Sequence, residues 1–118
     1  MQPMKHPAQI ARLLRYAQIN LNHSRLATRE LLALITQERL DAILVQEPYC
    51  IRTTDNRYKI PGLGQHIKQA HVNTQTRPLA SVILINRARD ALFLPQYSSP
   101  NVSTIKFAKQ INAMDPTP

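Results

Sequence analysis

The sequence predicts an α/β fold that opens with a β-α-β unit and continues as antiparallel strands. Two apolar segments of strand length, residues 13–20 and 42–46, are separated by a segment with helical periodicity. Three more aliphatic segments follow at 79–86, 91–94 and 102–107, with turn residues between them. This order of elements favours a mixed sheet, and the first crossover is expected to be right-handed, as almost all are.

The segment between the first two strands has the pattern of an amphipathic helix. Its apolar residues recur at spacings of three and four, namely Ala27, Leu31, Leu34 and Ile35. Either Asn22 or Ser24 can cap this helix, because each side chain can accept a hydrogen bond from a free first-turn amide. We expect the helix to cover one face of the sheet and to leave the other face without a helix.

The second strand, residues 42–46, is apolar almost without interruption, which suits a parallel strand covered on both faces. Glu47 follows it and precedes Pro48. Proline disfavours helical backbone at the residue before it. The sequence therefore predicts extended backbone at Glu47, with the carboxylate directed outward at the end of the strand.

Residues 50–78 are polar and weakly periodic, and they predict a long excursion with one short strand near 65–70. Order returns in the later strands, of which 102–107 alternates in character. Ser103, Ile105 and Phe107 are expected on one face of this strand and Lys106 on the other. An aliphatic sheet face with no helix over it would expose apolar surface, so we expect more chain or a partner to cover it.

These elements predict one domain over residues 12–107, between a disordered leader at 1–11 and an irregular tail at 108–118. Cys50 is the only cysteine, so an internal disulfide is impossible and a reducing compartment fits. The first residues lack the apolar core of a signal peptide, and no apolar run is long enough to span a bilayer. We expect a protein of the nucleus or cytoplasm that is not secreted and does not contact membranes.

The chain is strongly basic, with 15 Lys and Arg residues against 7 Asp and Glu residues and a net charge of +8. Such a balance favours a polyanionic partner such as a nucleic acid. A basic but merely solvated surface gives the same composition, and charge by itself leaves both interpretations open.

Two polar residues stand where the first two strands end, Asn20 and Glu47. Parallel strands place their carboxyl ends at the same edge of a sheet, which is where open α/β sheets bind ligands. An acid and an amide there, on a basic chain, indicate a metal site that handles phosphate. The alternatives are an exposed strand-end acid for Glu47 and a turn residue that satisfies its own backbone for Asn20. His23 and Arg25 lie just beyond and could contact phosphate, or could simply begin a solvated helix.

Four segments together resemble the endonuclease domain of non-LTR retrotransposons. They are Gln-Ile-Asn-Leu-Asn at 18–22, Asp-Ala-Ile-Leu-Val-Gln-Glu-Pro-Tyr at 41–49, and the stretches 79–86 and 94–102. That domain belongs to the endonuclease/exonuclease/phosphatase superfamily and is similar to apurinic/apyrimidinic endonucleases. The resemblance spans residues 12–107. It implies a DNase I-like two-sheet α/β sandwich, of which this chain would supply an incomplete, N-terminal portion.

The resemblance also implies a chemistry, which is hydrolysis of DNA phosphodiesters with Mg²⁺ or Mn²⁺ at one site. Glu47 matches the metal-binding glutamate of the family, and Asn20 matches the asparagine that supports the catalytic site. The implied partner is target-site duplex DNA, and the parent protein would be fused to a reverse transcriptase. A hard cation that keeps most of its waters needs few protein ligands, so one carboxylate and a substrate phosphate can suffice.

The family's Asp-x-Asn and Ser-Asp-His motifs do not occur in the 118 residues. Its catalytic tyrosine would fall within 110–116, where the chain carries Asn112 or Met114. We therefore expect a fragment of an endonuclease that is inactive as an isolated chain. The alternative is a non-catalytic basic module that binds nucleic acid. A phosphorylated small molecule or lipid as substrate is less favoured, because of the basic charge and the Gln-Glu-Pro-Tyr segment.

Overall fold

A computed structural model describes residues 13–108 of the chain. The leader expected at 1–11 lies outside the described residues. So do the segment 110–116 and all of the expected tail except residue 108. Within residues 13–108, the helices are all too short to cross a membrane.

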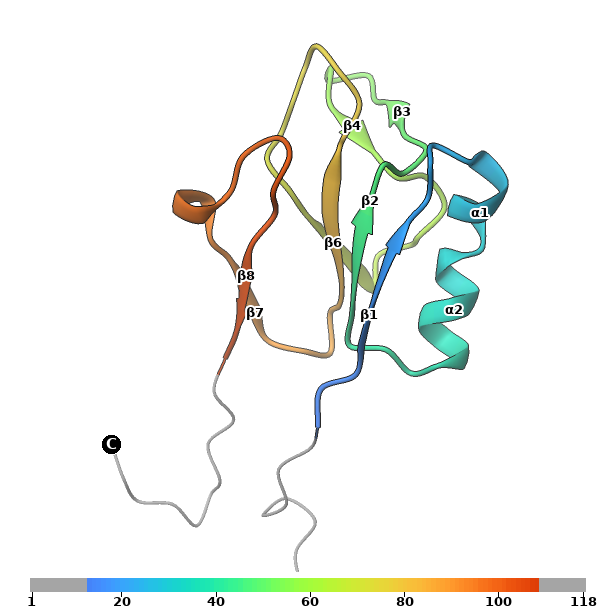
Figure 1. Cartoon of the computed structure of the whole chain (residues 1–118), viewed down its shortest axis with the longest axis vertical. Coiled ribbons are helices and arrows are strands. Elements are labelled where there is room, and N and C mark those ends of the chain that lie inside the picture. The colour runs from blue at the N-terminus through green and yellow to red at the C-terminus, as the bar shows by residue number, and fades with distance from the viewer. Residues whose placement is uncertain (1–12, 109–118) are drawn as a thin grey trace, which may run out of the picture.

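A four-stranded mixed sheet with the strand order β1-β2-β6-β5 forms the centre of the structure (Figure 1). Strand β1 (Tyr16–Asn20) runs parallel to β2 (Ala42–Gln46), whose bounds are those predicted. Strand β6 (Ser81–Asn86) pairs antiparallel with β2 and with β5 (Ile67–Ala70). The predicted β-α-β opening followed by antiparallel strands is confirmed. Strand β1 is shorter than predicted and starts at Tyr16 rather than at residue 13.

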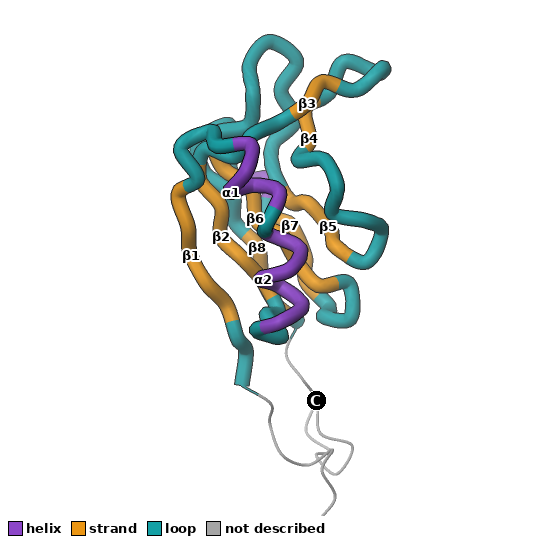
Figure 2. The backbone as a smooth tube through the Cα atoms, turned by 90° about the vertical axis from the view of Figure 1, so that its right-hand side faces the viewer, coloured by secondary structure: helices purple, strands orange, loops and turns teal. Residues whose placement is uncertain are grey.

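Two short helices, α1 (Arg25–Arg29) and α2 (Leu31–Gln37), connect β1 to β2 and lie over one face of the sheet (Figure 2). Of the two possible caps Ser24 is the one used, because its Oγ accepts a hydrogen bond from the amide of Ala27 at 3.1 Å. The single predicted helix is divided at Glu30, which ends α1 and caps α2.

The main core fills the space between these helices and the sheet. It includes Leu31 and Ile35 of the predicted helical stripe, while Ala27 and Leu34 pack partly buried against it. Its strand residues alternate in sequence, as one face of a sheet requires: Ile43, Val45, Val82 and Leu84. This packing holds the two helices against the sheet, on what we call the helix side, and so positions the loop that joins β1 to α1.

The other face of the sheet is covered only in part, by the pair β7 (Ala91–Phe93) and β8 (Ile105–Phe107). A second small core lies there, in which Ala42, Ala70, Ile83 and Ile85 contact the inner residues of the two strands. Beyond this pair the face is open, since the side chain of Tyr16 is 67% exposed and that of Leu44 is 36% exposed. The expected uncovered apolar surface is present, and the prediction that β2 is buried on both faces is wrong at Leu44.

The connection between β2 and β5 contains a hairpin that the sequence did not predict, formed by β3 (Ile51–Arg52) and β4 (Tyr58–Lys59). Strands of two residues leave no alternation to recognise. The side-chain amide of Gln69 accepts from the amide N–H of Ile60 at 3.0 Å and donates to its carbonyl at 2.9 Å. These two bonds attach the excursion to the predicted strand β5. The last two strands are shorter than the predicted 91–94 and 102–107, and a 3₁₀ turn, Pro95–Tyr97, lies in their connection.

Candidate metal and phosphate site

The strands β1 and β2 end side by side at one edge of the sheet. Asn20 pairs with Gln46 in the parallel register. The ladder continues past the strands, since the amide of Leu21 donates to the carbonyl of Gln46 at 2.9 Å. The amide of His23 donates to the carbonyl of Glu47 at 2.7 Å. The segments 20–23 and 46–47 are thereby held together at one rim, as the strand order predicted.

The backbone of this rim lies in the left-handed region at three residues: Asn22 (φ 53°), His23 (φ 60°) and Glu47 (φ 52°). The predicted extended backbone at Glu47 is wrong. Its amide donates to the carbonyl of Ala80 at 3.0 Å while its carbonyl accepts from His23, and these two bonds outweigh the local preference of a residue before proline. Residues held in sparsely populated backbone conformations cluster at functional sites.

Glu47 is half-buried, and its carboxylate forms no hydrogen bond or ion pair with any residue of 13–108. The other acids of that range differ from it. Three of them have polar partners, namely Glu38, Asp41 and Asp55, and two are exposed, namely Glu30 and Asp90. A half-buried charge without a partner is costly, so a bound cation would stabilise this carboxylate.

Asn20 is the last residue of β1 and its side chain is exposed. Its Oδ1 accepts a hydrogen bond from the amide of Asn22 at 2.9 Å, so the alternative role of a turn residue is present in the structure. The bond uses one of the two lone pairs of this oxygen, and the side-chain NH₂ group can still donate. Asn20 can therefore donate to a phosphate oxygen or to the Glu47 carboxylate while its backbone turn stays intact.

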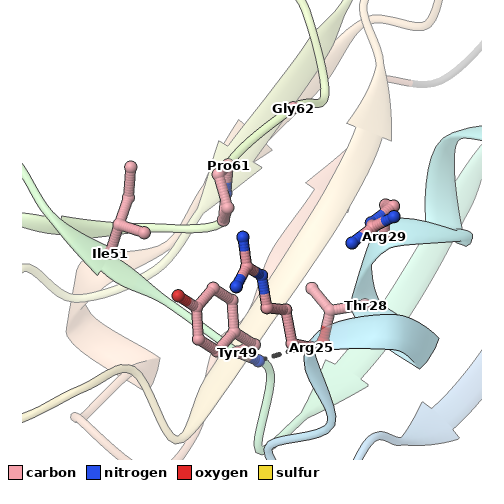
Figure 3. A pocket seen from close by; sticks show the side chains of 7 residues that line it. All are labelled: Arg25, Thr28, Arg29, Tyr49, Ile51, Pro61 and Gly62. Atoms are coloured by element: carbon pink, nitrogen blue, oxygen red, sulfur yellow. Dashed lines mark hydrogen bonds between the residues drawn. The ribbon is translucent and has the colours of Figure 1, made fainter.

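His23 belongs to the rim and Arg25 begins α1, and both side chains are exposed. The Arg25 guanidinium lies 5.7 Å from the centroid of the Tyr49 ring (Figure 3). Tyr49 and Arg29, which line the same pocket as Arg25, were not singled out from the sequence. The signal that could have found Arg29 is its four-residue spacing from Arg25, because such residues share one face of a helix.

The donor set at the rim fits a hard divalent cation better than zinc. Residues 13–108 contain no cluster of three or more His, Cys, Asp or Glu side chains arranged to hold a metal. Structural and catalytic zinc sites need at least three protein ligands. Mg²⁺ is commonly held by one or two carboxylates, substrate phosphate and water, which Glu47 could provide in part.

Comparison with protein-family models and with curated proteins gives no match. Comparison with solved structures gives the "Endonuclease domain of TRAS1, a telomere-specific non-LTR retrotransposon", at a TM-score of 0.65 and 19% sequence identity. The match covers 82% of this chain and 41% of that structure. The chain thus has a partial DNase I-like fold, as the resemblance implied, and spans about two fifths of the length of the domain it matches.

Proposed function

We propose that this chain is part of a divalent-metal-dependent DNA endonuclease, with the rim of β1 and β2 as one wall of the catalytic site. The carboxylate of Glu47 supports this proposal, because it is half-buried and has no partner among residues 13–108. The partial DNase I-like fold supports it as well. The target-site duplex as substrate, and association with a reverse transcriptase, remain predictions from the resemblance.

Each residue of the rim has a separate part in this proposal. Glu47 holds one Mg²⁺ or Mn²⁺ ion through its carboxylate. Such an ion, when bound, polarises a phosphoryl oxygen and stabilises the leaving alkoxide. Asn20 supports the site by donating from its NH₂ group, while its oxygen accepts from the amide of Asn22. His23 and Arg25 would contact the DNA beside the rim, where both side chains are exposed.

The described residues do not supply the rest of the reaction. A general base must lie within hydrogen-bond reach of the attacking water, and it typically contributes about 10²–10⁴-fold to the rate. His23 is the only histidine at the rim, and its backbone is tied to Glu47 in a loop with exposed side chains. We therefore expect the isolated chain to bind metal and DNA but to show no appreciable nicking activity.

A non-catalytic module that binds nucleic acid is the second candidate. The observation in its favour is that Arg25 and Arg29 form no ion pair with residues 13–108. Both candidates predict DNA binding that weakens steeply as salt rises. They differ at Glu47, because only the endonuclease proposal requires a cation there.

Paramagnetic broadening by Mn²⁺ in amide NMR spectra of the full chain tests the metal site. We expect broadening concentrated at residues 20–23 and 46–47, and we expect Glu47→Gln to abolish it. Glu30→Gln is the matched control, because Glu30 is an exposed acid with no partner among residues 13–108. Broadening that survives Glu47→Gln, or that centres elsewhere, would remove the metal from this rim and leave the binding module.

Plasmid nicking with added Mg²⁺ tests the expected inactivity of the isolated chain. We expect relaxed plasmid to stay at the level of the no-protein control. Nicking that depends on Mg²⁺ and disappears in Glu47→Ala would contradict the inactivity while supporting Glu47 as the ligand. Nicking that persists in Glu47→Ala would place the chemistry elsewhere.

A further inference from the structure

A pocket beside the rim lies between α1, the segment after β2 and the turn at 61–62 (Figure 3). Its volume is about 260 Å³, and its walls include Arg25, Arg29, Tyr49 and Ile51. Ligand pockets for drug-sized molecules occupy roughly 300–1,000 Å³. This pocket is therefore of a size for one planar group, such as a single nucleobase, and too small for a base pair.

The charged side chains that line the pocket are all positive. Arg25 and Arg29 line it, and no acidic residue does. The two arginines are four positions apart in α1, where like charges repel one another. Neither has an acidic partner among residues 13–108, so an anion such as a phosphate would relieve this repulsion.

The backbone of Tyr49, whose ring forms one wall of the pocket, is anchored to α1 by hydrogen bonds. The amide of Tyr49 donates a hydrogen bond to Oγ1 of Thr28 at 3.0 Å, and the hydroxyl of Thr28 donates to the carbonyl of Ser24 at 2.6 Å. Thr28 is only 2% exposed, so this connection is part of the packed interior. The backbone of Tyr49 is therefore fixed against α1, and the Arg25 guanidinium lies over its ring.

We propose that this pocket binds one unstacked nucleobase of a DNA strand, stacked against Arg25 and Tyr49, while Arg29 contacts the adjacent phosphate. Aromatic rings and guanidinium planes are the surfaces on which proteins stack single-stranded bases. Ile51 and Pro61 supply apolar walls, which a bare phosphate site does not need. Because a paired base cannot enter alone, the pocket favours single-stranded or locally opened DNA over duplex.

The inference rests on the proposed function and extends it. Tyr49 follows Glu47 by two residues, so the pocket continues the rim along the path of a bound strand. A nucleotide held there would place a neighbouring part of the same strand at Asn20 and Glu47. The pocket would therefore select and position the DNA strand that reaches the rim, and it would not take part in the reaction itself.

A pair of probes separates base recognition from charge. One is a fluorescein-labelled single-stranded thymidine oligonucleotide, and the other is an oligomer of the same length and charge with abasic tetrahydrofuran residues. Binding of the full chain is measured by fluorescence anisotropy in EDTA, so that the result is independent of the metal site. Stacking of one base predicts about tenfold tighter binding of the thymidine oligomer.

Tyr49→Leu should remove this preference for bases, whereas Tyr49→Phe, which keeps the ring, should retain it. The matched control is Tyr97→Leu, because Tyr97 is 67% exposed and lies in the 3₁₀ turn away from the helices (Figure 1). Arg29→Gln should weaken both oligomers alike and lower the salt dependence by about 0.7 in log–log slope, as loss of one single-strand phosphate contact does. Arg77→Gln, an exposed arginine outside the pocket, should have a smaller effect.

Equal affinity of the wild-type chain for the two oligomers would overturn the proposal, and so would a preference that Tyr97→Leu reduces as much as Tyr49→Leu. These outcomes do not depend on Mn²⁺ broadening at Glu47. Failure of the base pocket and failure of the metal site therefore give different results.

Discussion

The left-handed backbone at Glu47 predicts that the proposed metal ligand is a site of reduced stability. A non-glycine residue in this conformation costs roughly 1–2 kcal/mol. Glycine avoids that cost. It lowers the free energy of unfolding by about 0.4–1 kcal/mol relative to alanine, however, because it gives the unfolded chain more conformational entropy. Both substitutions at this position remove the carboxylate, so comparing Glu47→Gly with Glu47→Ala isolates the backbone. We expect the glycine variant to be more stable by about 0.8 kcal/mol.

The assay is urea unfolding in EDTA, followed by circular dichroism. Ala33 provides the control, because it is exposed in the middle of α2 and has ordinary helical backbone. There Ala33→Gly should destabilise the chain by about 1 kcal/mol. The sign of the Ala-to-Gly effect should therefore reverse between positions 33 and 47. Loss of stability at both positions would refute the reasoning and would mean that Glu47 does not hold a left-handed conformation in solution.

Two further predictions concern the interior. Asp41 is buried and accepts from the amide of Arg15 at 2.8 Å and from Arg89 at 3.5 Å, so Asp41→Asn should cost about 3 kcal/mol in urea unfolding. Glu38→Gln, which removes an exposed ion pair with Arg15, should cost less than about 1 kcal/mol, and similar losses for both would contradict the burial argument. Burial raises the pKa of the Cys50 thiol, with a backbone hydrogen bond from Leu79 opposing the shift. The thiolate is the nucleophile, so iodoacetamide near pH 8 should alkylate Cys50 of the folded chain more slowly than it alkylates the thiol of free glutathione. The two rates should become similar only at higher pH, and equal rates near pH 8 would count against the raised pKa of Cys50.

The elements that were predicted well are those with strong periodicity. Residues 42–46 form a strand with the predicted bounds, and Leu31 and Ile35 are buried as the helical stripe required. The periodicity of apolar residues indicates which side chains face a core. It succeeded here because one continuous core lies between the helices and the sheet. The strand pairing then follows from the short connections and the parallel crossover.

The features that were missed are set by contacts between distant segments. The conformation of Glu47 depends on hydrogen bonds to His23 and Ala80, which are far from it in the sequence. The β3–β4 hairpin is attached through Gln69, whose side chain imitates a backbone partner for Ile60. Neither arrangement leaves a local pattern. The same holds for Tyr49, whose place in the pocket depends on Thr28 of another element.

The proposed metal rim and the proposed base pocket lie on the same side of the sheet, so a substitution on the other side tests whether they are independent of it. The rim and the base pocket are built from the β1–α1 loop, α1 and the end of β2, all of which rest on the well-packed helix side. The opposite face carries only the β7–β8 pair and leaves Tyr16 and Leu44 exposed. Substitutions on the open face, such as Leu44→Ser, should therefore leave Mn²⁺ and oligonucleotide binding unchanged, whereas disruption of the helix side should abolish both together.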